Sequence, residues 1–125
     1  MLASVCSANL FGVEGRGVWV ETHVSAGLPS YTIVGLPDTS GRESRERVRA
    51  AILSSGFDFP PSRITVNLAP ATLRKQGAGI DLAIALGLFV AGQLLPASVL
   101  DGTAALGELG LDGRIRAVPG VLALV

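Results

Sequence analysis

The stretch ITVNLAPATLRKQGAGIDLAIALGLFVAGQLL, from Ile64 to Leu95, decides the fold of this chain. Its first part, Ile64–Leu68, alternates β-branched and polar residues and predicts a buried strand. Pro70 ends that strand, because proline cannot donate a hydrogen bond to a neighbouring strand. Residues 80–94 then predict a helix that is apolar on almost every face, so it has to lie inside the protein. We therefore expect the other elements to pack around this helix.

The loop between that strand and that helix, Thr72 to Gly79, is a candidate binding site. It carries Arg74, Lys75 and two glycines in front of a helix N-terminus, where free N–H groups and the helix dipole favour an anion. A purely structural turn is the alternative. The chain contains no G-x-x-x-x-G-K-[ST] motif, so we expect no nucleotide hydrolysis within it.

The composition is that of a single globular domain with no dominant charge. The chain has 125 residues, of which 49% are hydrophobic and 16% are charged. Its formal net charge is zero, so no global basic field attracts nucleic acid. Any nucleic-acid binding would depend on a local cluster of cations.

Several other classes of protein are disfavoured by single residues. One cysteine, Cys6, excludes an internal disulfide, and together with one histidine, His23, it cannot assemble a zinc site of nitrogen and sulfur ligands within one chain. The apolar segment 82–100 is interrupted by Gln93 and Pro96, and its uninterrupted part is shorter than the ~20 residues that a membrane span needs. The start of the chain does not resemble a signal peptide. We expect a cytoplasmic protein without a membrane segment.

The remaining elements predict an α+β fold, a mixed sheet packed against helices, in the order β-β-β-α-β-α-β-β-α. Three strands come first and are expected to form a meander, with turn glycines at 12, 15 and 17. Asp112–Gly113 is a strong hairpin signal near the other end. The predicted strands cover residues 1–11, 18–24, 31–34, 64–68, 103–111 and 114–118. The last residues, 121–125, predict the first turn of another helix, so we expect one domain, 1–125, truncated at its C-terminal end.

The first helix is expected to begin near Asp38. Ser40 and Glu43 fit a capping box, with Asp38 as a competing N-cap, and Gly56 fits the cap at the other end. Glu43 also lies one turn before Arg47 and is its expected ion-pair partner. Helical spacing directs three apolar side chains towards the sheet, namely Val48, Ala51 and Ile52.

Arg42, Arg45 and Arg49 fall together on a neighbouring stripe of this helix. A row of arginines can follow a phosphate backbone, because each neutralised phosphate releases counterions. The alternative is an ordinary solvated face whose charge is balanced by Glu43 and Glu46. The stripe is the second candidate binding site of the chain.

Several blocks of the sequence closely resemble the ComM/YifB family of bacterial magnesium-chelatase-like AAA+ ATPases. These blocks are Gly35–Asp38, Glu43–Ala51, Ser55–Phe57, Ile64–Pro70 and Leu73–Lys75. The resemblance covers essentially the whole chain and implies the N-terminal domain that precedes the ATPase module. It also implies a fold similar to the Lon protease domain, within the ribosomal protein S5 domain 2-like group.

The resemblance implies that this domain has no catalytic residue. Lon-type proteases place a serine at the start of the central helix and a lysine after the last hairpin. Here Gly77 stands at the serine position and Leu122 at the lysine position. Without a hydroxyl nucleophile and an amine to deprotonate it, no acyl-enzyme can form. A peptidase with a rearranged nucleophile, Ser98 or Thr72, is the alternative.

For the whole protein, the resemblance implies a hexameric, ATP-driven DNA helicase that promotes branch migration during uptake of transforming DNA. ATP and Mg²⁺ would belong to the ATPase module, so we expect no cofactor here. The chain itself is then expected to be non-enzymatic and to support assembly and contact with single-stranded or branched DNA. The residues expected to contact DNA or another subunit are Arg42, Arg45, Arg49, Arg74 and Lys75. A chelatase-type scaffold for a metal or tetrapyrrole is a further alternative.

Overall fold

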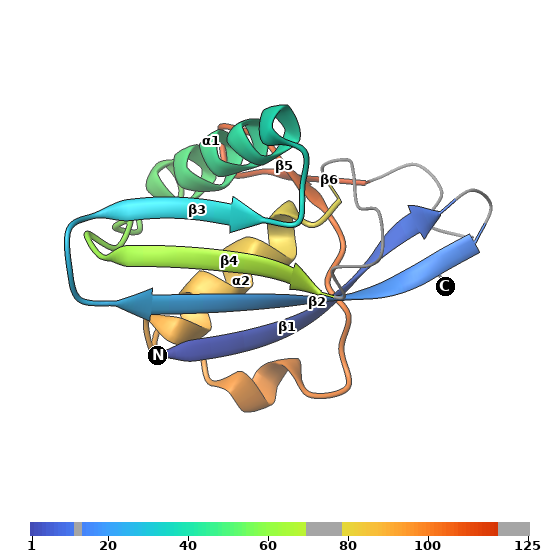
Figure 1. Ribbon diagram of the computed structural model, residues 1–125, viewed down its shortest axis with the longest axis horizontal. Coiled ribbons are helices and arrows are strands. Elements are labelled where there is room, and N and C mark those ends of the chain that lie inside the picture. Colours follow the sequence, from blue (N-terminus) through green and yellow to red (C-terminus); the bar gives the residue numbers. More distant parts are fainter. Residues whose placement is uncertain (12–13, 70–78, 118–125) are drawn as a thin grey trace.

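The chain folds into a four-stranded sheet with two helices on one face and a small hairpin beside them (Figure 1). The structure is a computed structural model that describes residues 1–11, 14–69 and 79–117. The hydrophobic core lies between the inner face of the sheet and the two helices, and side chains of all four strands line or border it. The predicted α+β class with a mixed sheet is confirmed.

The sheet does not begin with a meander. Its strands are β1 (Leu2–Phe11), β2 (Glu14–Ser25), β3 (Ser30–Val34) and β4 (Arg63–Ala69). They lie side by side in the order β1-β2-β4-β3 (Figure 1). β4 is antiparallel to β2 and parallel to β3. The most apolar strand, β4, takes a central position because Ile64, Val66 and Leu68 are fully buried there, and β3 is left as an edge strand.

β1 and β2 form a long antiparallel hairpin. Its ladder runs from Leu2 opposite His23 to Phe11 opposite Glu14. Gly15 and Gly17 therefore lie within β2 rather than in the turn where the sequence placed them. Because β4 pairs with β2 only from Trp19 onwards, the tip of the hairpin extends beyond the rest of the sheet (Figure 1).

The first helix, α1 (Asp38–Ser54), connects the parallel strands β3 and β4. Its N-cap is Pro37, which makes no side-chain cap, so the predicted capping box and the predicted Asp38 cap are both wrong. At the other end the N–H groups of Gly56 and Phe57 donate to the carbonyls of Leu53 and Ile52. With φ of 88° at Gly56, this is a Schellman motif, and it confirms the predicted glycine cap. The inward face is also as predicted, with Val48, Ala51 and Ile52 buried.

The second helix, α2 (Asp81–Ala91), is buried as predicted but shorter than residues 80–94. It ends early because Gly92 caps it and Gln93 adopts a left-handed φ of 63°. Seven of its eleven residues are buried, namely Asp81, Ala83, Ile84, Ala85, Gly87, Leu88 and Ala91. Neither α2 nor any other helix in the described ranges is long and apolar enough to cross a membrane.

A short 3₁₀ helix, η1 (Ala97–Leu100), precedes the final hairpin of β5 (Glu108–Leu109) and β6 (Ile115–Arg116). The hairpin is confirmed, with Gly113 at φ of 88° in its turn. Each of these strands has only two residues and is much shorter than the predicted strands 103–111 and 114–118. The helix predicted over 121–125 lies outside the described residues.

Gly35 is required where β3 turns towards α1. Its φ is 107°, and a Cβ atom there would lie 3.0 Å from both the Cβ and the carbonyl oxygen of Leu68. Gly35→Ala is therefore expected to lower the free energy of unfolding by about 2–3 kcal/mol, measured by urea denaturation. The control is Gly102→Ala, which has φ of 70° but nothing within 4 Å, and should cost about 1 kcal/mol. Equal losses for the two variants would contradict this explanation.

Candidate functional site: the arginine face of α1

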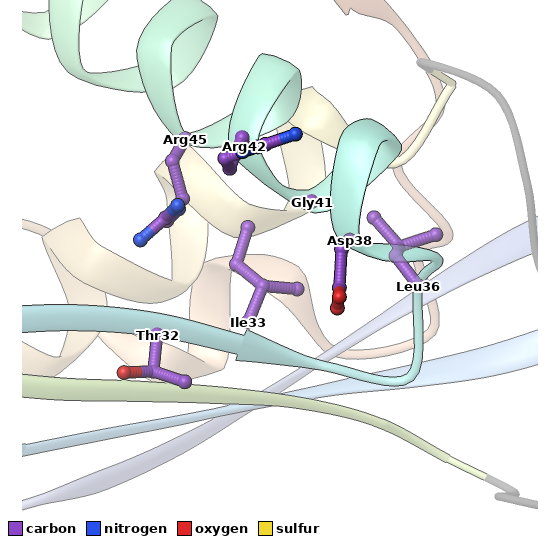
Figure 2. A pocket seen from close by; sticks show the side chains of 7 residues that line it. All are labelled: Thr32, Ile33, Leu36, Asp38, Gly41, Arg42 and Arg45. Atoms are coloured by element: carbon purple, nitrogen blue, oxygen red, sulfur yellow. The ribbon is translucent and has the colours of Figure 1, made fainter.

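The three arginines of the predicted stripe lie on the side of α1 that faces the edge strand β3. Arg42 and Arg45 line a cavity of about 280 Å³ between α1 and β3. Figure 2 shows the other side chains of this cavity, with Thr32 and Ile33 from β3 and Asp38 from the first turn of α1. The structure therefore brings two of the predicted residues together at a concave surface beside an open strand edge.

The three side chains are held in different ways. The Nη1 atom of Arg45 donates a hydrogen bond of 2.8 Å to the carbonyl oxygen of Tyr31 in β3. The guanidinium carbon of Arg49 lies 5.9 Å from the centre of the Phe59 ring, a cation–π distance. Arg42 is exposed at the rim of the cavity. Arg45 and Arg49 thus each contact a neighbouring residue, whereas Arg42 is exposed to solvent.

The arginines of this face form no salt bridge within the part of the chain that the structure describes. No salt bridge joins Arg42, Arg45 or Arg49 to a described acidic residue. Glu43, one of the two carboxylates that would balance the stripe in the alternative, lies 3.8 Å from Arg47 and confirms the predicted ion pair of these two residues. The described residues therefore do not support a face neutralised by Glu43.

The other predicted site residues lie outside the described residues. These are Arg74 and Lys75 in the loop before α2, Gly77 and Leu122 at the positions of the Lon serine and lysine, and the alternative nucleophile Thr72. Their roles, and any approach of Arg74 and Lys75 to the α1 arginines, stay predictions.

The most elaborate polar cluster of the described chain is one that the sequence analysis missed, and it centres on Asp81. This carboxylate is completely buried at the first residue of α2. Arg47 donates to it from Nε at 2.6 Å and from Nη2 at 3.3 Å. The Ser44 hydroxyl donates at 2.7 Å and the Leu109 N–H at 3.2 Å. One side chain thereby joins α1, α2 and β5.

A signal for this cluster was present in the sequence. Asp81 is the one acidic residue in a strongly apolar segment, and a buried carboxylate needs a cation and hydrogen-bond donors. Arg47 was assigned to Glu43 because the two are one turn apart. The structure places Arg47 much closer to Asp81, at 2.6 Å. The hydrogen bond between these two side chains raises the pKa of Arg47 above its ordinary value.

Tyr31 lies between this cluster and the arginine face. Burial raises the pKa of its phenol well above the ordinary value of 10.0, and the nearby negative charge of Asp81 raises it further. The phenol therefore stays neutral at physiological pH. Its hydroxyl has no hydrogen-bond partner among the described residues. Tyr31 thus serves the site through its ring, which packs on Phe59 with the centroids 5.2 Å apart.

The described residues offer little for the alternative chemistries. Ser98 is exposed in η1, and its hydroxyl makes no hydrogen bond to a described residue that could act as a base. Within the same ranges no group of three His, Cys, Asp or Glu side chains could hold a metal ion. The arginine face is therefore the best-supported candidate site.

The family of the chain follows from comparison with known proteins. A sequence profile described as subunit ChlI of Mg-chelatase matches residues 20–125. The chain belongs to the ChlI family. The match includes α1, with its arginine face, and Asp81 with its partners.

The ChlI-family chain is also similar to curated bacterial proteins. It is 47% identical over 121 residues to YifB of Salmonella typhimurium and 46% identical over 121 residues to YifB of Escherichia coli. It is 45% identical over 121 residues to the competence protein ComM of Haemophilus influenzae. These matches cover 97% of this chain but 24% of each relative, so the chain spans about a quarter of their length. The resemblance to ComM and YifB proteins is confirmed.

The Asp81 cluster is expected to contribute strongly to stability. Asp81→Asn keeps the shape of the side chain but leaves Arg47 with only the more distant carboxylate of Glu43, at 3.8 Å, as an acidic partner. We expect a loss of about 2–3 kcal/mol in the free energy of unfolding, less than for a fully buried pair because 20% of the Arg47 side chain is exposed.

The matched control for Asp81→Asn is Asp112→Asn. Asp112 lies 3.6 Å from Arg114 in a pair that is exposed on both sides, and its loss should change stability by less than about 0.5 kcal/mol. Thermal and urea unfolding of both variants test the expectation. A similar small effect in both would mean that the buried carboxylate does not hold the three elements together.

Proposed function

We propose that this chain is a non-catalytic N-terminal module of a hexameric ComM-type ATPase, and that it supports assembly of the hexamer and its contact with DNA. The observation that carries the proposal is the arginine face of α1, where three cations form no salt bridge within the described chain. A local group of cations can bind phosphates although the net charge of the chain is zero.

The family membership supports the wider parts of the proposal. A relative of 45% identity is named a competence protein, and this name agrees with a role in the uptake of transforming DNA. In the proposal the whole protein is a cytoplasmic helicase acting in branch migration, and ATP and Mg²⁺ bind to a module that this chain does not include. The proposed module has the Lon-like, S5 domain 2-like fold, with Gly77 and Leu122 in place of the catalytic pair.

DNA contact is tested in the whole protein with Arg42, Arg45, Arg49, Arg74 and Lys75 all changed to Ala. We expect weaker binding of single-stranded and branched DNA in fluorescence anisotropy. The slope of log affinity against log salt concentration should fall by about 0.7–0.9 for each lost phosphate contact.

Two further measurements make that experiment decisive. The control variant changes Arg114 and Arg116 to Ala, two exposed arginines of the β5–β6 hairpin, and should keep the wild-type slope. Light scattering after size exclusion reports whether hexamers persist. An unchanged affinity and slope with intact hexamers would remove the five residues from both proposed roles.

A further inference from the structure

The outer edge of β3 has backbone groups that no other strand of the described chain covers. β3 pairs only with β4, through a parallel ladder. The N–H of Ser30 points towards β4, since it donates to Ser62 O at 3.2 Å. Backbone groups alternate in direction along a strand, so the N–H and C=O of Tyr31 and Ile33 point outwards. The Tyr31 carbonyl accepts a hydrogen bond from Arg45 of α1, as expected of a group that does not pair with β4.

Hollows lie on both faces of this edge. On the helix side is the 280 Å³ cavity with Arg42 and Arg45 (Figure 2). Around the start of β3, on the open face of the sheet, a second hollow of about 630 Å³ is lined by Leu28, Thr32 and Arg63, among others. Successive side chains of a strand point to opposite faces. A strand added to β3 would therefore place its side chains alternately into one hollow and the other.

The charges around the edge select the chemistry of such a strand. Three arginines line the two hollows, Arg42, Arg45 and Arg63, and Asp38 is the one acidic residue of the described chain that lines either. A guanidinium has five N–H donors, so Arg45 can hold Tyr31 O and still receive a carboxylate. A second copy of this chain is a poor occupant, because pairing of β3 with β3 would bring the same arginines together.

We propose that the free edge of β3 binds an extended acidic segment of a partner protein by strand addition, with its carboxylates at Arg42, Arg45 and Arg63. This rests on the proposed role as an assembly module and names the chemistry of the partner. Phosphates bind arginines without using a strand edge, whereas an added peptide strand uses the outward N–H and C=O of Ile33 and the N–H of Tyr31. These backbone groups distinguish peptide from DNA.

The test uses the 125-residue chain and a fluorescein-labelled peptide of about ten residues in which pairs of glutamates alternate with pairs of valines, so that an extended strand carries carboxylates on both faces. Saturable anisotropy binding is expected, together with slower hydrogen exchange at the amides of Tyr31 and Ile33. Arg42→Gln combined with Arg45→Gln should weaken binding at least about fivefold. Arg42→Gln alone should weaken peptide binding less than the double variant does. Because the Arg42 side chain is exposed, this single variant is expected to fold even if the double variant does not. The control Arg114→Gln should bind as the wild type does.

Three comparison probes, two altered peptides and a single-stranded oligonucleotide, distinguish an acidic strand from other occupants of the β3 edge. The same peptide with lysine for glutamate, and the glutamate peptide with alternate backbone nitrogens methylated, should both fail to bind. Absence of saturable binding by the glutamate peptide, or binding without protection of Tyr31 and Ile33, overturns the inference. The inference is also overturned if a single-stranded oligonucleotide of equal charge binds more tightly than the glutamate peptide and depends on the same arginines. Self-association of the chain through β3 overturns it as well. If the inference fails in one of these ways but the whole protein still forms hexamers and binds DNA, the proposed function stands without the peptide site.

Discussion

The buried carboxylate of Asp81 is the interaction on which the arrangement of the other elements depends. An ion of this kind is costly to bury unless charge and hydrogen bonds compensate for it, and here four donated hydrogen bonds from three residues do so. Those residues come from α1 and β5, while Asp81 itself begins α2. The two helices and the small hairpin therefore have one mutual arrangement that satisfies the carboxylate. The negative charge also lies at a helix N-terminus, where the helix dipole favours it.

This constraint also orients the candidate site. Arg47 turns inwards to Asp81, and helical periodicity then directs Arg42, Arg45 and Arg49 to the side of α1 that faces β3. One helix thus carries two kinds of arginine. Arg47 stabilises the fold, and the other three, which form no salt bridge within the described chain, lie beside an uncovered strand edge. The proposals for DNA and for an acidic partner segment both depend on this separation.

Local patterns predicted local features well. The alternation in Ile64–Leu68, the apolar helix after it and the glycine cap at Gly56 were each confirmed. Prediction failed where a second element decided the outcome. β3 was expected beside β2, but the parallel connection through α1 puts it beyond β4. The capping box at Ser40 failed because the helix begins earlier, at Asp38 after Pro37. For the site, the grouping of Arg42 and Arg45 was predicted, whereas Arg74 and Lys75 stay predictions.

The sequence by itself determined the class of fold, the buried identity of α2 and β4, and the stripe of arginines on α1, because periodicity along one element suffices for each of these. Only the tertiary structure decided the order of the strands, the partner of Arg47 and the free edge beside Arg42 and Arg45. The physical reason is the distance along the chain. Arg47 is 34 residues from Asp81, and pairings over such a separation are selected by how the whole core packs rather than by any local pattern.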